Sequence, residues 1–171
     1  DLTILAEHIG GSGVGTGFTN WTYQQEPDSI VWVVRSDGVL TGMTYQRGEN
    51  VVAWHRHILG GAFSGGDAVV ESVAAISNST ASSKGEDTLY MIVKRTINGG
   101  TKRYIEYLQP FDFGSNIEDA WFLDSGLVYS GSATTTLTGL SHLEGQTVGV
   151  LVNGATHADK TVSSVISPLD T

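Results

Sequence analysis

The chain has 171 residues, of which nine are Lys or Arg and 18 are Asp or Glu, so its net charge at pH 7 is −9. Such a sparse set of cations argues against a nucleic-acid-binding surface, because the affinity of those surfaces comes from Lys and Arg side chains that neutralise phosphates. The absence of cysteine excludes disulfides, thiolate metal ligands and cysteine nucleophiles. No apolar run reaches the roughly 18–20 residues of a membrane-spanning helix. Because residue 1 is Asp rather than Met, we expect a piece of a longer protein.

The 22 glycines and the 16% of charged residues favour an ordered protein that is rich in turns. A helical pattern occurs over Leu2–Ile9, where Asp1 would cap the helix and Gly10 would end it. The glycine-rich run Gly10–Gly17 is expected to be a surface loop, since no Lys follows the glycines as it does in a phosphate-binding loop.

From Ser29 onward the sequence has the period of two that predicts antiparallel β-meanders. The first meander has three expected strands, Ser29–Arg35, Val39–Tyr45 and Val51–His57. The second has Asp67–Ile76, Thr88–Arg95 and Lys102–Leu108, with a long loop at Ser77–Asp87 and a hairpin turn at Asn98-Gly99-Gly100. The two meanders repeat at an offset of roughly 55–60 residues, and repeated units of this kind are typical of propeller blades.

Pro110 interrupts the second meander, because proline cannot donate a hydrogen bond to a sheet. We therefore divide the chain into a blade-like antiparallel β-meander region, residues 1–109, and a small β-barrel or sandwich, residues 110–171. Four short strands are expected in the second region: Ser125–Ser130, Thr134–Leu137, Thr147–Val152 and Thr161–Ile166. Turns are expected at Asn153-Gly154 and Ala158-Asp159, and the predicted fold class is all-β.

Two histidines are the candidates for a metal site. His55 and His57 are two residues apart on an expected strand, so both imidazoles face the same side, as strand-borne metal ligands do. The possible further ligands are His8, Glu71, His142 and His157. None of these lies in a second ligand motif, so pairing with acidic groups or packing is the favoured interpretation, and no metal or other cofactor is predicted.

Three aromatic side chains near expected loops are candidates for ligand contacts. Trp21, Tyr23 and Trp121 could stack on sugar rings or pack against a partner subunit, whereas the aromatics within expected strands belong in the core. The latter are Trp32, Trp54 and Tyr90.

Evidence for an enzyme is weak. Carboxylates gather among aromatics at Glu106, Asp112, Glu118, Asp119 and Asp124. Nothing in the pattern fixes two of them on one rigid face at the roughly 5–10 Å separation of a glycosidase pair. The sequence also lacks the Gly-x-Ser-x-Gly elbow of a serine hydrolase. We therefore predict a protein that is not an enzyme and has no catalytic residues.

The meanders resemble a segment of bacteriophage tail proteins of the tail-tube, nozzle or adaptor type. The similar segments are Tyr23–Leu40, Thr44–Arg47, Val51–His57, Val70–Val73, Lys94–Gly99, Arg103–Glu106, Gly139–Val148 and Val150–Gly154. The resemblance covers roughly Leu2–Ile166, with Gly10–Gly17 and Ser77–Asp87 as apparent insertions. It implies a small C-terminal barrel that is sometimes labelled a ubiquitin-activating-enzyme half-domain, but without cysteine no thioester can form.

The resemblance implies a structural module of a phage or prophage tail, made in the bacterial cytoplasm and incorporated into the virion. Its expected partners are other tail proteins or copies of itself, with no direct nucleic-acid binding and no membrane span. Two alternatives from other classes stay open: a receptor- or glycan-binding module that uses the aromatic candidates, and a metal-assisted hydrolase that uses His55 and His57.

Overall fold

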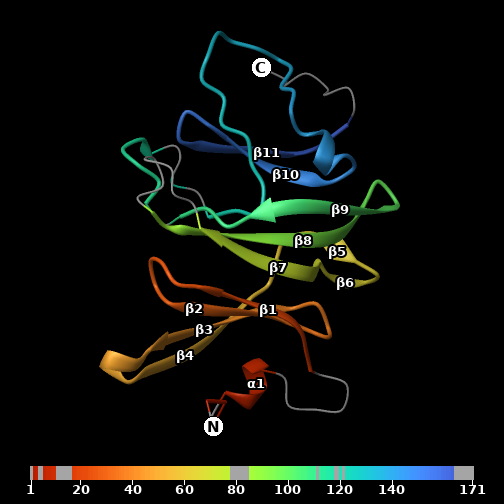
Figure 1. Ribbon diagram of the computed structural model, residues 1–171. Coiled ribbons are helices and arrows are strands. Elements are labelled where there is room, and N and C mark those ends of the chain that lie inside the picture. The colour runs from red at the N-terminus through yellow and green to blue at the C-terminus, as the bar shows by residue number, and fades with distance from the viewer. Residues whose placement is uncertain are drawn as a thin grey trace. The chain divides into compact units, whose positions relative to one another are not determined.

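The computed structural model describes residues 2–3, 6–10, 17–77, 85–110, 112–117, 120 and 122–163 (Figure 1). The protein is all-β: of the described residues 50% lie in strands and 8% in helices, and the antiparallel sheets have a meander-like strand order. The predicted fold class is therefore confirmed. The chain forms two compact units, one of residues 1–95 and 103–113 and the other of residues 96–102 and 114–171. The tip of one hairpin thus belongs with the C-terminal unit, in addition to the residues after 113.

The first sheet of the first unit is a four-stranded antiparallel meander in the order β1-β2-β3-β4. Its strands are β1 (Phe18–Gln24), β2 (Ile30–Arg35), β3 (Leu40–Gln46) and β4 (Val51–His57), and a short 3-10 helix, η1 (Arg47–Glu49), precedes β4. The three strands predicted for the first meander are present as β2, β3 and β4. The stretch Phe18–Tyr23, which the sequence marks only as strand-prone, adds the fourth strand at one edge.

The second sheet has the order β7-β8-β9, with strands β7 (Val69–Ser77), β8 (Asp87–Ile97) and β9 (Gly100–Tyr107). A short hairpin precedes this sheet, and its two strands, β5 (Ala62–Phe63) and β6 (Gly66–Asp67), have two residues each. The predicted turn between β8 and β9 is confirmed: Asn98 and Gly99 both have positive φ, 48° and 72°, as a tight hairpin turn requires.

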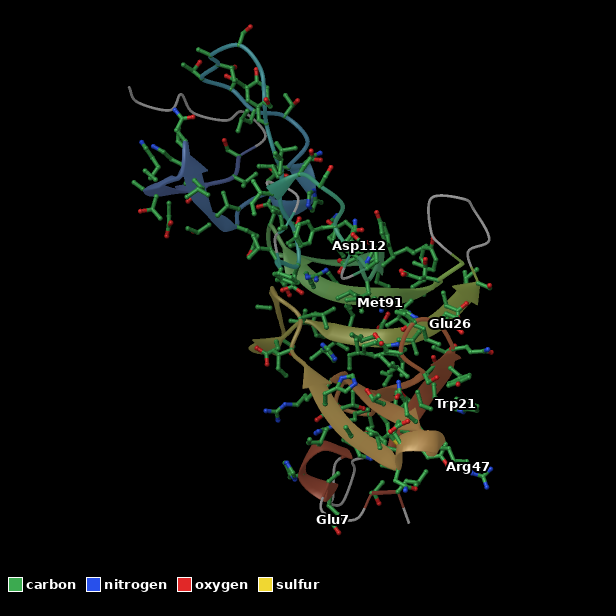
Figure 2. All side chains as sticks on the ribbon, turned by 90° about the vertical axis from the view of Figure 1, so that its left-hand side faces the viewer. Glu7, Trp21, Glu26, Arg47, Met91 and Asp112 are labelled. Carbon is green, nitrogen blue, oxygen red and sulfur yellow. The ribbon has the colours of Figure 1, made fainter. Side chains whose placement is uncertain are left out.

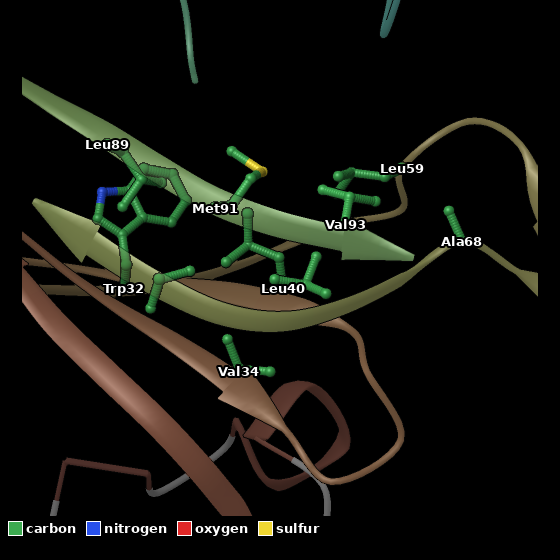
Figure 3. Packing of buried hydrophobic residues seen from close by; sticks show 10 residues of the cluster. Trp32, Val34, Leu40, Leu59, Ala68, Leu89, Met91 and Val93 are labelled. Atoms are coloured by element: carbon green, nitrogen blue, oxygen red, sulfur yellow. The ribbon is translucent and has the colours of Figure 1, made fainter. Parts of the chain in front are cut away.

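Apolar side chains from both sheets form one core in the first unit (Figure 3). The first sheet contributes Trp32, Val34 and Leu40, and the second contributes Val70, Val73, Leu89, Met91 and Val93. Each fully buried aliphatic side chain of this kind stabilises a fold by about 1.5–3 kcal/mol. The core therefore joins the two sheets, and Trp32 fulfils its predicted core role with 2% exposure.

Polar side chains on the inward side of β1 complete the edge of the second sheet. Asn20 Oδ1 accepts a hydrogen bond from the backbone N–H of Val73 at 2.9 Å, and Thr22 Oγ1 accepts one from Ala75 at 3.0 Å. These contacts satisfy two donors on the strand edge of β7 that faces away from β8. Gln24 extends the pattern, because its Oε1 accepts from Trp32 Nε1 and its Nε2 donates to the Asp87 carbonyl, both at 2.7 Å.

The N-terminal helix is shorter than the sequence predicts. α1 (Glu7–Gly10) is a single turn, and Thr3 and Ala6 lie outside it; Asp1, the predicted cap, is outside the described residues. One turn closes little of its own backbone, so such a helix depends on tertiary contacts. The Ile9 carbonyl accepts a hydrogen bond from Arg35 at 2.8 Å, which fixes the end of α1 against β2. No helix of the described residues is long and apolar enough to cross a membrane.

The second unit contains the hairpin β10 (Thr147–Val152) and β11 (Ala155–Thr161), preceded by the 3-10 helix η3 (Ser141–Leu143). The predicted strand Thr147–Val152 and the turn Asn153-Gly154 are present, the latter with φ of 49° and 80°. The strands predicted at Ser125–Ser130 and Thr134–Leu137 are wrong, and the described residues contain no closed barrel.

The turn predicted at Ala158-Asp159 is wrong, and of the strand predicted at Thr161–Ile166 the described Val162 and Ser163 lie outside any strand, while residues 164–166 are outside the described residues. β11 ends at Thr161, and Ala158-Asp159 lies inside it rather than in a turn. The register moves from Val148 opposite Lys160 to Val150 opposite His157, so β11 has one extra residue at this point. Residues with turn preference suit a bulge as well as a turn, because both need a local departure from extended geometry.

Candidate functional site

The outward side of the first sheet carries a row of exposed aromatic residues, which we call the aromatic face: Phe18, Trp21, Tyr23 and Tyr45. Trp21 lies opposite the buried Val33, and Tyr23 lies opposite Val31. Directly opposed residues of a sheet share a side, so both rings point away from the core that Trp32 occupies. Trp21 is 68% exposed and Tyr23 46% exposed. Figure 2 labels Trp21 on its strand.

The sequence analysis named Trp21 and Tyr23 but placed them near loops. The structure places both within β1, where they are held by the ladder to β2. The period-two pattern of Asn20–Gln24 was the signal that could have assigned them to a strand. Phe18 lies three residues before Trp21 and shares its side only because of the register shift between Phe18 and Asn20, which the sequence pattern does not reveal. Trp121, the third predicted ligand contact, lies outside the described residues.

One end of the aromatic face is packed by the N-terminal segment. The Phe18 ring stacks on Trp54 with centroids 6.0 Å apart, and Trp54 Nε1 donates a hydrogen bond to the Leu2 carbonyl at 2.8 Å. Trp54 is thus half-buried at the surface rather than in the core where the sequence analysis expected it. Phe18 keeps 48% exposure, similar to the 46% of Tyr23, and Trp21 is the most exposed ring of the face at 68%.

The two candidate metal ligands form a hydrogen-bonded pair, the histidine pair. His55 Nδ1 lies 2.7 Å from His57 Nε2, and the rings meet edge to face with centroids 4.9 Å apart. The nitrogen separation is much shorter than the centroid separation, so the two nitrogens face each other. The predicted same-side orientation on β4 is therefore present.

The histidine pair packs on the largest core residue. The ring of His55 lies 5.5 Å from the Trp32 ring centroid and that of His57 5.2 Å from it. Burial lowers the pKa of His55, and burial together with the neighbouring His55 lowers the pKa of His57. Both effects favour neutral imidazoles, in which one nitrogen donates and the other accepts.

The further ligands that the sequence offered are engaged elsewhere or are not near the pair. Glu71 binds two cations, Lys94 at 2.9 Å and Arg103 at 2.6 Å, and these lower its pKa to about 2. Among the described residues no group of three or more His, Cys, Asp or Glu side chains could hold a metal ion. A structural zinc site uses four ligands, and the histidine pair alone would supply two of them.

Glu106, one of the carboxylates considered for glycosidase chemistry, is engaged by an arginine. Glu106 forms a two-pronged ion pair with Arg95 on β8, whose guanidinium also donates to the Gly60 carbonyl at 2.7 Å. Glu118 and Asp119 lie outside the described residues. The ion pair with Arg95 is therefore enough to explain where the Glu106 carboxylate lies.

A hydroxyl–imidazole contact in the second unit was missed from the sequence. Ser125 Oγ lies 2.6 Å from His142 Nε2, and both side chains are half-buried. Seventeen residues separate them, and no motif surrounds either one. A nucleophile and base meet at such distances in hydrolases, but the same contact also anchors an irregular segment to a turn of 3-10 helix. Here it joins Ser125 to η3.

No protein-family model matches the chain, and no curated protein matches it in sequence. The class that the structure defines is an all-β protein with an antiparallel meander fold. Its two sites with the clearest geometry are the aromatic face and the histidine pair.

Proposed function

We propose that the chain is a structural module of a bacteriophage or prophage tail protein, and that it binds other tail proteins or copies of itself through the aromatic face. The observation that carries the binding role is the exposure of Trp21 and Tyr23 on a strand of a rigid sheet. Tyr and Trp are enriched in the buried centres of protein interfaces. The tail assignment rests on the sequence resemblance described above.

The construction of the first sheet supports an assembly role. Alternate side chains of β1 have different roles. Asn20 and Thr22 form hydrogen bonds to the second sheet, while Trp21 and Tyr23 face outward. A partner would therefore meet aromatic rings whose backbone is fixed on the opposite side. Little conformational entropy would be lost on binding, which is the advantage of a preorganised interface.

The net charge fits this role as well. A chain of net charge −9 repels DNA, so a tail component of this composition would line or flank a DNA path without retaining the DNA. In this proposal the protein is made in the bacterial cytoplasm, is incorporated into the virion, and needs neither a catalytic residue nor a cofactor.

The test measures association directly. The chain is mixed with the products of the neighbouring genes, and its own oligomeric state is followed by light scattering over a wide concentration range. Replacement of both Trp21 and Tyr23 by Ser should weaken the association at least about tenfold, since interface aromatics of this kind are often worth 2 kcal/mol or more. Ile105→Ser is the matched control, because Ile105 is 78% exposed but lies on β9 of the second sheet. A wild-type chain that stays monomeric and binds none of these products would refute the proposal.

A second candidate is a glycan-binding module, favoured by the spacing of the same two rings. Residues i and i+2 of a strand are about 6.8 Å apart on one side, and Trp21 and Tyr23 form such a pair. Flat aromatic rings at this spacing could each stack on a sugar of an extended chain. A glycan array probed with the wild type and with Trp21→Ala tests this role: binding must occur and must depend on Trp21. An array without hits at high protein concentration would count against it.

A further inference from the structure

The histidine pair lies at the edge of the first sheet and touches the core directly. We propose that it acts as an acid-sensitive clasp: His55 and His57 share one hydrogen bond that holds β4 against Trp32, and the uptake of a second proton opens it. This property goes beyond the proposed function, because it concerns how the edge of the sheet responds to acid and not what the aromatic face binds.

The opening follows from the number of protons that the contact can hold. At 2.7 Å the facing Nδ1 and Nε2 atoms can carry one hydrogen between them. A neutral pair has this arrangement, and a pair with one added proton keeps it with a charge-assisted bond. With two added protons both facing nitrogens become donors and both rings become cations. That state cannot keep the observed geometry.

Close packing makes the clasp sensitive to this change. Gly42 of β3 lies directly opposite His55, and a Cβ atom built on Gly42 would lie 2.2 Å from His55 Cε1. Because Gly42 has no side chain, the imidazole of His55 can lie over it and pack beside Trp32. Within the part of the chain that the structure describes, β4 is an edge strand that pairs with β3 alone, so the loss of the histidine contacts leaves it held by this ladder and by contacts of its outward side.

Among the described residues no carboxylate forms a cluster with the two histidines, so the second proton has no adjacent counter-charge. The neighbours on the same side of β2 and β3 are Trp32, Val34, Leu40 and Gly42, none of which titrates. On the inward side of the second sheet, Arg95 and Glu106 bind each other, and the Asp87 carboxylate accepts hydrogen bonds from the backbone N–H groups of Gln25 and Glu26. Lys102 and Tyr104 share that side of β9. Arg56, between the two histidines, alternates to the outward side.

Amide hydrogen exchange of the whole chain, followed by NMR between pH 7.5 and pH 5 and corrected for the intrinsic exchange rate, tests the clasp. We expect the β4 amides, Val51–His57, to lose at least tenfold more protection than those of β2 as the pH falls. In the double variant His55→Gln/His57→Gln the pH dependence should disappear, because an amide side chain can donate and accept without titrating. His157→Gln is the matched control, since His157 is an exposed histidine of β11, and it should keep the wild-type dependence.

Two results would overturn the clasp: β4 protection that does not change with pH, or a pH dependence that survives in the double glutamine variant. An imidazole NMR titration of the wild type serves if the variant does not fold. It should show two separate steps for the pair, with the second at lower pH than the ordinary histidine value of 6.5. A pair that titrates in a single step at that ordinary value would equally exclude the proposal.

Discussion

Replacement of Gly42 by Ala should destabilise the first unit through His55. Gly42 has no positive φ, so alanine fits the backbone, and any penalty must come from the new methyl group. That methyl would lie 2.2 Å from His55 Cε1 and 2.8 Å from His55 Nε2, far inside ordinary van der Waals contact. The imidazole must therefore leave its position between Gly42 and Trp32.

The expected magnitude combines three effects. Overpacking of a dense region costs about 1–3 kcal/mol, and the loss of the hydrogen bond between His55 and His57 costs about 0.5–1.5 kcal/mol. Alanine in place of glycine in a strand returns about 0.5–1 kcal/mol, because the unfolded chain loses conformational freedom. The net expectation is a loss of about 0.5–4 kcal/mol in the free energy of unfolding.

Urea denaturation at pH 7.5, followed by tryptophan fluorescence, measures this loss. Gly48→Ala is the matched control, because nothing lies within 4 Å of a Cβ at Gly48. The decisive comparison is Gly42→Ala in a His55→Ala background, where the clashing ring is gone and the penalty should nearly disappear. The reasoning fails if Gly42→Ala is as harmless as Gly48→Ala, or if its penalty is unchanged without the His55 ring.

Three further changes probe other parts of the first unit. Leu89→Ala removes a core side chain with 0% exposure and should cost about 2–5 kcal/mol in urea denaturation, whereas the exposed Leu151 of the second unit should tolerate alanine. Gln24→Ala leaves the buried indole N–H of Trp32 without its acceptor and should cost about 1–3 kcal/mol; an unchanged midpoint would mean that water replaces the glutamine. The pKa of Glu71 is lowered from 4.5 to about 2, so its stabilising effect is present above pH 4.5 and is lost as the pH falls toward 2. Glu71→Gln should flatten the acid limb of stability in that window, and an NMR titration of the wild-type carboxyl near 4.5 would contradict the assignment.

The histidine pair has its own linkage to pH. In the unfolded chain each histidine takes up a proton near its ordinary pKa of 6.5, whereas burial lowers the pKa of both in the folded state. The unfolded state therefore binds more protons, so this contribution to stability is present above pH 6.5 and declines as the pH falls below it. Glu71 acts at lower pH, so the two effects can be separated along one pH series.

The sequence was a good guide wherever turn chemistry and period agreed. Asn98-Gly99 predicted a hairpin whose residues have the required positive φ, and the strand from Val51 to His57 was predicted with the bounds that the structure shows. In the second unit the period is weak: Ala155–Thr161 has no apolar alternation and is held by its turn and backbone ladder. Such a strand leaves little trace in hydropathy, which explains why Ala155–Thr161 was not predicted and a strand was expected instead at Thr134–Leu137.

The candidate sites were predictable only in part, because side-chain partners come from distant segments. The same-side placement of His55 and His57 follows from spacing alone, but their packing on Trp32 depends on Gly42, which is 13 positions before His55 and opposite it only in the folded register. The bulge at Glu71 is another example. The register shift between Val70 and Ser72 places an extra residue there, and its carboxylate reaches cations on two other strands. No local pattern specifies such contacts.

The two sides of β1 give the chain a way to separate stability from binding. Inward residues Asn20 and Thr22 satisfy backbone donors of β7, so their loss would leave buried polar groups unpaired and weaken the pair of sheets. Outward residues Trp21 and Tyr23 have much of their surface in solvent, so their truncation removes little that the fold depends on. A binding defect in Trp21→Ala with an unchanged unfolding midpoint would therefore locate a partner on the aromatic face. The same defect accompanied by a lower midpoint, as Thr22→Ala should give, would instead indicate damage to the sheet.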